Sequence, residues 1–399
     1  MKVISYILYF ILFFGLFYAE NFEVGGGIKF SQAWKIPLIF LMLGYVVYHK
    51  MRTFSFNKVA YLMAFKQFVN EGIFRSTIVN IIEFFRYLNL PLLIHSQDIY
   101  FKSPIRLYLF ILRIGQYFIL SSLPFLLGIL KSVREGVEFG DNMSYTGFFQ
   151  SSHSASIITC FSILIIVNHV RKIKLSKLEL IYNVLLILLG LYCLYLAFVR
   201  TGYLMLLIGL VVMFFPKKID VKQFFGMVFI CGLLSITFVQ LVKHNKSFEQ
   251  RIFDLNARGE QREVGSGRLV FIKHSIDYWS DGNSYVILFG RGIENIKDNL
   301  YKKIGIRIVT HNGYTDMLVI NGVVGLALFF LFLGKIFYYI RKNKNTPSYR
   351  FTLAIFLSYI TFLATQGGVL FTVDLILASS LVLLNKEQML LGQVTNIKV

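Results

Sequence analysis

Charged residues are scarce in this sequence. Of its 399 residues, 16% are Asp, Glu, Lys or Arg, whereas 56% are hydrophobic and 17% are aromatic. In a soluble domain, about a quarter of the residues are charged. Apolar runs near or above about 18 residues recur from end to end, and runs of that length cross a bilayer as helices. The composition therefore excludes a soluble globular protein and predicts an all-α polytopic membrane protein.

Cysteines and metal-binding motifs are scarce as well. The three cysteines, Cys160, Cys193 and Cys231, all lie inside apolar runs, where a thiol behaves as a small buried hydrophobic group. The sequence has no CxxC, no HExxH and no cluster of Asp, Glu and His. We therefore expect no disulfide framework, no bound metal and no other cofactor.

Acidic residues are only half as frequent as basic ones, 21 against 41, and the formal net charge is +20. There is no soluble domain that could use this charge to bind nucleic acid. Much of it falls in short loops, which the positive-inside rule assigns to the cytoplasm, and alternation from these loops puts both termini inside. The loops contain Lys50/Arg52/Lys58, Arg171/Lys172/Lys174/Lys177, Lys217/Lys218/Lys222 and Arg341/Lys342/Lys344/Arg350.

We expect ten to twelve membrane helices, and the spans predicted third and fourth are interrupted by Lys66, Glu83 and Arg86. The first run fits an uncleaved first helix or a signal peptide. Residues 1–242 then hold nine helices, 243–310 form one large external loop, and 311–399 hold the last helices and a short cytoplasmic tail. The predicted spans are 3–19, 36–49, 58–70, 76–95, 107–130, 151–170, 180–199, 202–216, 222–242, 312–340, 351–366 and 369–385.

The external loop is positively charged although it is predicted to lie outside, and two interpretations of its arginines are open. They form an ordinary solvated surface, or they bind an anion, because the planar guanidinium matches phosphate oxygens. Gly265-Ser266-Gly267-Arg268 precedes apolar positions spaced as in an amphipathic helix. Phe289-Gly290-Arg291-Gly292 predicts a turn that exposes Arg291.

Arg200 is the second unusual polar residue. It lies between two apolar runs that together cover residues 180–216, and an arginine facing lipid near the bilayer centre costs a few kcal/mol. The two short runs predict a tight external hairpin with Arg200 at the membrane face. Arg200 is then either an interfacial anchor for lipid headgroups or a phosphate contact inside the bundle.

His311-Asn312 opens a long apolar run, and nine residues separate Asn312 from Gly322, which is followed by Gly325. An imidazole exchanges protons near neutral pH, so His311 is a candidate for acid–base chemistry at a membrane surface. The alternative is a helix-capping residue without a chemical role. The two glycines, three residues apart, are predicted to share one helical face that a neighbouring helix approaches closely.

These motifs resemble the O-antigen polymerase and O-antigen ligase superfamily. His311-Asn312 with Gly322 and Gly325 matches its H-N-x9-G-x-x-G signature, and Gly267-Arg268 with the turn around Arg291 resembles its external loop. Arg200-Thr201-Gly202 resembles its arginine element between two helices, although Val199 replaces the usual Ser or Thr.

The resemblance covers the chain from about residue 140, where Tyr145-Thr146-Gly147-Phe148-Phe149-Gln150 is similar to the family's Gly-Phe turn. It implies a GT-C-like glycosyltransferase that uses neither metal nor nucleotide sugar. The donor is a glycan on polyprenyl pyrophosphate. Arg200 and Arg268 are implied to stabilise the pyrophosphate leaving group, with Arg291 as a weaker third contact.

By the same resemblance, His311 is the general base for the acceptor hydroxyl. Asn312 either fixes the orientation of the imidazole or binds a sugar hydroxyl. Tyr314 is an external aromatic residue that either stacks on a sugar ring or packs against other side chains. The function expected is an O-antigen or capsular polysaccharide polymerase at the outer face of a bacterial inner membrane, together with membrane lipid and a chain-length regulator as partners. The alternative is a ligase that moves the glycan to lipid A core or another acceptor. A lipid-linked glycan flippase is disfavoured because the sequence shows no internal repeat.

Overall fold

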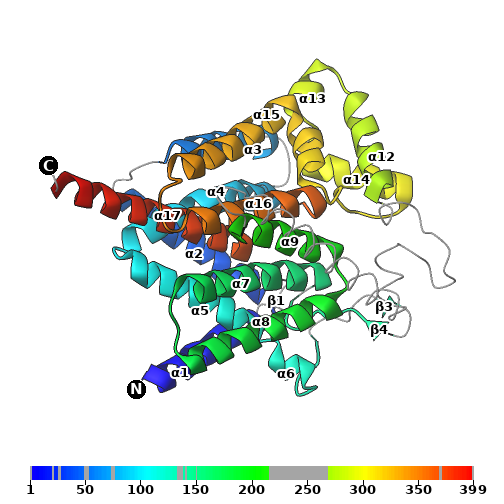
Figure 1. Cartoon of the computed structure of the whole chain (residues 1–399). Coiled ribbons are helices and arrows are strands. Elements are labelled where there is room, and N and C mark those ends of the chain that lie inside the picture. The colour runs from blue at the N-terminus through cyan, green and yellow to red at the C-terminus, as the bar shows by residue number, and fades with distance from the viewer. Residues whose placement is uncertain are drawn as a thin grey trace, which may run out of the picture.

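The protein is described from a computed structural model, which defines residues 2–19, 22–25, 28–48, 54–72, 77–132, 138–139, 142–149, 151–214, 268–367 and 371–397. In these residues the chain is almost entirely helical, and most of the helices lie side by side in a bundle (Figure 1). The predicted class, an all-α polytopic membrane protein, is confirmed.

The described residues up to Phe214 form nine helices. Two short antiparallel ribbons, β1 (Glu23–Gly25) with β2 (Ile28–Lys29) and β3 (Glu138–Phe139) with β4 (Asn142–Met143), connect some of them. The helices are α1 (Lys2–Ala19), α2 (Phe30–Tyr48), α3 (Ser55–Gly72), α4 (Thr77–Tyr100), α5 (Pro104–Leu120), α6 (Leu123–Leu126), α7 (Ser152–Lys172), α8 (Lys177–Ala197) and α9 (Arg200–Phe214).

The described C-terminal part begins with three shorter helices and continues with three long ones. The predicted span 222–242 and the loop residues up to Gly267 lie outside the described residues. The helices are α12 (Arg268–Ser280), α13 (Ser284–Phe289), α14 (Ile293–Ile304), α15 (Gly313–Lys342), α16 (Tyr349–Thr365) and α17 (Phe371–Ile397).

Every predicted span within the described residues contains a helix, although several of the helices begin or end a few residues away from the predicted bounds. In the span expected at 107–130, α5 ends at Leu120 and the short helix α6 continues to Leu126. Between them, the hydroxyl groups of Ser121 and Ser122 donate to the carbonyl oxygens of Tyr117 and Ile119. The last helix continues to Ile397. Four helical stretches of the described chain have the length and apolarity to cross a membrane: Pro104–Leu126, Ser152–Lys172, Lys177–Ala197 and Gly313–Lys342. Three shorter apolar helices accompany them.

Helix α7 lies inside the bundle and packs against α5, α8, α9 and α16. Membrane helices associate through close packing at small residues, and neighbours of α7 present glycine to it. A Cβ on Gly190 of α8 would lie 2.9 Å from Cγ1 of Ile163, and one on Gly209 of α9 would lie 2.5 Å from Cδ1 of Leu164. Helices α8 and α9, which meet at Arg200, are thus packed closely against one central helix.

One end of the bundle gathers basic residues from the short loops. Arg171 at the end of α7 donates to the carbonyl oxygen of Met213, and Lys172 donates to Oγ of Ser348 at 3.2 Å. Both chain termini lie at this end in Figure 1, and α12, α13 and α14 lie at the other. The predicted alternation of membrane spans likewise puts the two termini on one side and the loop that contains α12, α13 and α14 on the other.

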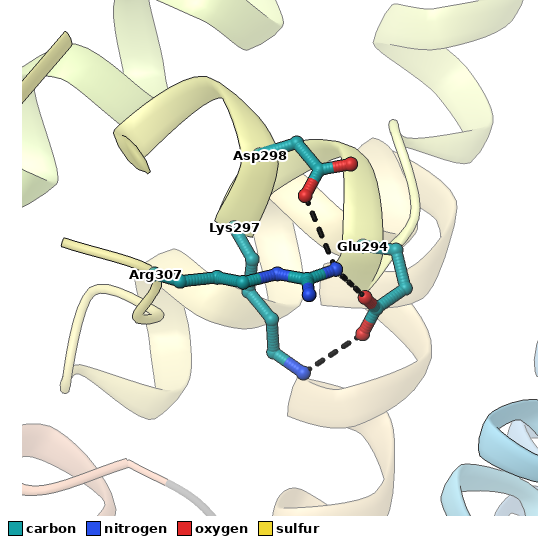
Figure 2. A network of polar contacts seen from close by, with 4 residues as sticks. All are labelled: Glu294, Lys297, Asp298 and Arg307. Atoms are coloured by element: carbon teal, nitrogen blue, oxygen red, sulfur yellow. Dashed lines mark hydrogen bonds and ion pairs between the residues drawn. The ribbon is translucent and has the colours of Figure 1, made fainter. Parts of the chain in front are cut away.

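At the other end, a polar network holds the chain that leads back to α15. Arg307 bonds Glu294 at 2.6 Å and Asp298 at 3.2 Å, while Lys297 bonds Glu294 at 2.9 Å (Figure 2). The hydrogen bond from Lys297 is the main reason that the pKa of Glu294 is lowered. Such half-exposed pairs contribute little to stability. They hold Arg307, which lies in the segment leading to His311, against α14.

Candidate functional site

Asn312 fixes the beginning of α15. Its side-chain oxygen accepts hydrogen bonds from the backbone N–H groups of Tyr314 at 3.1 Å and Thr315 at 3.0 Å, as an N-cap residue does. Its amide nitrogen donates to the carbonyl oxygen of Ala364 at 2.7 Å. Asn312 therefore joins the start of α15 to the end of α16.

The turn that contains His311 is held from both sides. Asp316 is buried, and its Oδ1 accepts hydrogen bonds from the backbone N–H of Thr310 at 2.9 Å and from the Thr310 hydroxyl at 2.7 Å. Between these residues, His311 has a left-handed backbone with φ +56°. Non-glycine residues adopt this conformation at a cost and mostly where the surroundings impose it. These contacts thus hold the backbone that carries the imidazole.

Four helices begin at a shared cavity of about 360 Å³. Arg200 is the first residue of α9 and Arg268 the first of α12, while His153 lies in the first turn of α7 and His311 just precedes α15. All four line the cavity. Because the amino-terminal end of a helix carries partial positive charge, four such ends favour an anion together with the two guanidinium groups. The remaining lining residues are Val199, Thr201, Leu204, Leu269, Ile272, Asn312, Ala364 and Thr365.

The two arginines are positioned by different means. Arg268 donates from Nη1 to the carbonyl oxygen of Thr365 at 2.6 Å, which ties α12 to the end of α16. Arg200 follows a tight joint in which Phe198, with φ +52°, ends α8 and Val199 leads directly into α9. This joint is the hairpin expected between the runs at 180–199 and 202–216.

Gln366 joins two histidines at this cavity, and sequence reasoning missed it. Its Nε2 lies 2.7 Å from Nδ1 of His153, and its backbone hydrogen-bonds the ring of His311. The second bond raises the pKa of His311, which identifies the ring as the donor. The other ring nitrogen of neutral His311 then carries the lone pair that a base needs.

The protonation of His311 also depends on its surroundings. Burial lowers its pKa below the ordinary 6.5, and the charge of Arg268 lowers it further. Both effects outweigh the opposing hydrogen bond to Gln366. His311 is therefore neutral at pH 7 and able to accept a proton.

His311 also lines a second cavity of about 290 Å³ that extends into the bundle. Its polar walls include Asp316, Gln366, Asp374 and Tyr359. The carboxyl groups were missed in the sequence, although an acidic residue inside an apolar run is expensive and commonly functional. Asp316 and Asp374 could have been selected by that criterion alone.

Two predicted substrate-binding residues lie elsewhere. Arg291 donates from Nε to the carbonyl oxygen of Tyr278 at 2.9 Å, and its guanidinium lies 4.1 Å from the centre of the Tyr278 ring. Tyr314 stacks on Phe330 within the bundle, at 5.7 Å between ring centres. Neither is among the residues that line the two cavities.

The predicted helical face with Gly322 and Gly325 is wrong in one respect, because α15 breaks at Gly322. Gly322 has φ +69° and ψ −174°, a conformation essentially restricted to glycine. A Cβ there would lie 2.3 Å from the carbonyl oxygen of Leu288. The close neighbour is therefore the end of α13 rather than another membrane helix.

The carbonyl groups before the break have partners outside α15. The N–H of Arg291 donates to Val319 at 3.0 Å, and that of Gly292 donates to Ile320 at 3.1 Å. Lys66 of α3 donates from Nζ to the carbonyl of Asn321 at 2.5 Å. The turn around Arg291 thus has a structural role, because it binds carbonyl groups of α15. Lys66, which in the sequence only interrupts a predicted span, binds the last carbonyl group before the break at Gly322.

Together these features define a polytopic membrane protein with arginines, histidines and helix amino termini gathered at one end of its bundle. Residues 185–330 match the family model described as O-Antigen ligase, a stretch that includes Arg200, Arg268 and His311. This match supports the resemblance to the O-antigen polymerase and O-antigen ligase superfamily that the motifs indicated. No curated protein matches the sequence. The family implies a glycosyltransferase-type membrane enzyme with a lipid-linked glycan as substrate.

Proposed function

We propose that the protein is an O-antigen or capsular polysaccharide polymerase, which joins repeat units carried on polyprenyl pyrophosphate. The observation that carries this proposal is the shared cavity lined by Arg200, Arg268 and His311. It combines what the reaction requires, namely cations for a leaving pyrophosphate and a base for an attacking hydroxyl.

Arg200 and Arg268 are proposed to bind the pyrophosphate of the donor. Negative charge develops on this leaving group as the bond to the anomeric carbon breaks, and fixed cations stabilise it most where water is excluded. A guanidinium can bind two phosphate oxygens at once. The amino termini of α9 and α12 add partial positive charge at the same place.

His311 is proposed to act as the general base. A ring nitrogen takes the proton of an acceptor hydroxyl, and the hydroxyl oxygen bonds the anomeric carbon. The bond from that carbon to pyrophosphate breaks, and its electron pair leaves on the phosphate oxygen. The lowered pKa of His311 supports this role, because only the neutral ring accepts a proton.

The site is proposed to face the periplasm or cell exterior of a bacterial inner membrane. The basic residues at the opposite end of the bundle support this direction, since such residues favour the cytoplasm. The arginines and histidines that line the shared cavity lie at one end of the bundle, which favours an enzyme over a lipid-linked glycan flippase, whose site would lie near the membrane midplane. The ligase that transfers a finished glycan remains the second candidate, because it would use the same donor and base.

Deletion of the gene followed by glycan analysis tests the proposal. Loss of a polymerase leaves single repeat units on the final acceptor, whereas loss of a ligase leaves full-length polymer on the polyprenyl carrier. Complementation with the wild-type chain should restore the normal glycan, and complementation with His311→Ala should not. A normal glycan in the deletion strain would contradict both functions.

A further inference from the structure

The second cavity beside His311 is chemically unlike the arginine-lined cavity. It is bounded by α3, α4, α14, α15, α16 and α17, and its volume is about 290 Å³. No lysine or arginine is among the described residues that line it. A phosphate group would thus meet carboxyl oxygens here instead of cations, so this cavity does not suit the pyrophosphate of the donor.

The lining fits a sugar. Asp316, Asp374 and Gln366 offer oxygen atoms that accept hydrogen bonds from hydroxyl groups, and Tyr359 adds a phenolic hydroxyl. Phe329 and Phe332, with neighbouring aliphatic side chains, form apolar walls that suit the C–H face of a sugar ring. Small-molecule sites commonly measure about 300–1,000 Å³ and combine apolar walls with a few polar groups. The volume here is at the lower limit and fits a short saccharide.

The position of His311 relates the two cavities, since this residue lines both. In a single displacement at the anomeric carbon, the hydroxyl attacks from the side opposite the leaving group. With pyrophosphate among the arginines, the attacking hydroxyl must arrive from the other side, next to the base. That requirement places the acceptor where the second cavity opens at His311.

We propose that the cavity lined by Asp316, Tyr359 and Asp374 is the acceptor-sugar subsite, an inference that rests on the function proposed above. Tyr359 and Asp374 lie on neighbouring helices, with the Tyr359 hydroxyl 3.4 Å from Oδ1 of Asp374. Asp316 also fixes the turn at His311 through Thr310. An acceptor sugar bound by these groups therefore lies next to His311. The arrangement of the groups selects which sugar hydroxyl reaches the imidazole.

Binding of two separate probes to the full-length protein in detergent tests the subsite. The probes are polyprenyl pyrophosphate without sugar and the repeat-unit oligosaccharide released from its carrier. Asp374→Asn should weaken oligosaccharide binding at least tenfold and change polyprenyl pyrophosphate binding less than twofold. Arg200→Lys should produce the opposite pattern. Asp98→Asn is the matched control, because Asp98 pairs with Lys386 at 2.9 Å elsewhere in the bundle and should alter neither affinity.

The outcomes separate the two proposals. If the wild type does not bind the oligosaccharide, if Asp374→Asn leaves its affinity unchanged, or if Asp374→Asn weakens both probes equally, the subsite is overturned. If polyprenyl pyrophosphate fails to bind, or binds equally well to Arg200→Lys, the proposed donor function fails. A saccharide site dependent on Asp374 would survive that second result. Tyr359→Phe provides a milder second variant, which keeps the ring and removes only the hydroxyl.

Discussion

The ammonium nitrogen of Lys66 on α3 lies 2.5 Å from the backbone carbonyl oxygen of Asn321, immediately before α15 breaks at Gly322. It also lies 3.0 Å from the side-chain oxygen of Asn321 and 2.9 Å from the carbonyl of Phe289. One side chain thus links α3, α15 and the end of α13. Since the half-helix before the break begins at the site, Lys66 contributes to its position.

Lys66→Met should lower the stability of the protein. Loss of the ammonium group removes a hydrogen-bond donor from the carbonyl groups of Asn321 and Phe289. Each carbonyl group left unsatisfied costs about 1–3 kcal/mol. Thermal unfolding in detergent measures the effect. Lys58→Met is the control on the same helix, because Lys58 is exposed. Equal unfolding temperatures for the two variants would contradict a role for Lys66 at the break.

Gly322→Ala should destabilise the protein strongly. Alanine disfavours the backbone conformation at Gly322, and its Cβ would collide with the carbonyl oxygen of Leu288. Gly334→Ala, farther along α15 with nothing within 4 Å of its new Cβ, should be neutral or stabilising by up to about 1 kcal/mol. Comparison of the two variants by thermal unfolding separates the break from general helix effects.

His311→Ala should abolish glycan transfer, while the protein is still inserted in the membrane. General base catalysis commonly contributes about 10²–10⁴-fold to the rate, so transfer by the purified variant should fall by at least that range. The control is His274→Ala, because His274 on α12 lines neither cavity. A normal rate for His311→Ala would disprove the assignment of the base.

Arg200→Lys and Arg268→Lys should each reduce transfer, because an ammonium group cannot reproduce the two parallel bonds of a guanidinium. Arg291→Lys should leave polyprenyl pyrophosphate affinity unchanged and lower the unfolding temperature, since Arg291 packs on Tyr278. Measurement of polyprenyl pyrophosphate affinity and of the unfolding temperature for all three variants distinguishes the two phosphate-binding arginines from the structural one. Full activity of both Arg200→Lys and Arg268→Lys would exclude the phosphate role.

The pH dependence of transfer should report His311. Only the neutral ring accepts a proton, so kcat/KM should fall as the pH drops through the pKa, which lies below 6.5. Arg268→Gln removes a positive charge that disfavours the protonated ring, so the pKa of His311 should rise. The acidic limb of the profile should therefore move to higher pH, whatever the reduction in rate. An unmoved midpoint would show that another group titrates.

Much of the fold follows from the sequence, because membrane helices are recognisable from apolar length alone. Arg200 and His311 could also be selected from the sequence. An arginine between two apolar runs and a histidine at the start of another are costly unless they serve a purpose. Arg268 depended on the family resemblance, since a single arginine in a polar loop is otherwise ordinary.

The missed features depend on distant parts of the chain. Gln366 joins His153 to His311 only because the end of α16 packs between the beginnings of α7 and α15. The break at Gly322 likewise depends on α13, whose backbone occupies the space of a side chain. A GxxG spacing is equally compatible with a straight helix and with a broken one, so the sequence alone favoured the wrong local geometry.

At His311, the requirements of stability and of the proposed activity differ, because the left-handed backbone favours glycine and the proposed chemistry needs an imidazole. Glycine adopts φ +56° without steric cost, whereas histidine, although more tolerant of this conformation than most residues, adopts it at a cost. A sequence optimised only for folding would therefore replace this histidine, and the replacement would remove the proposed base. Engineering for thermal tolerance should for that reason hold residue 311 fixed and seek its gains elsewhere in the chain.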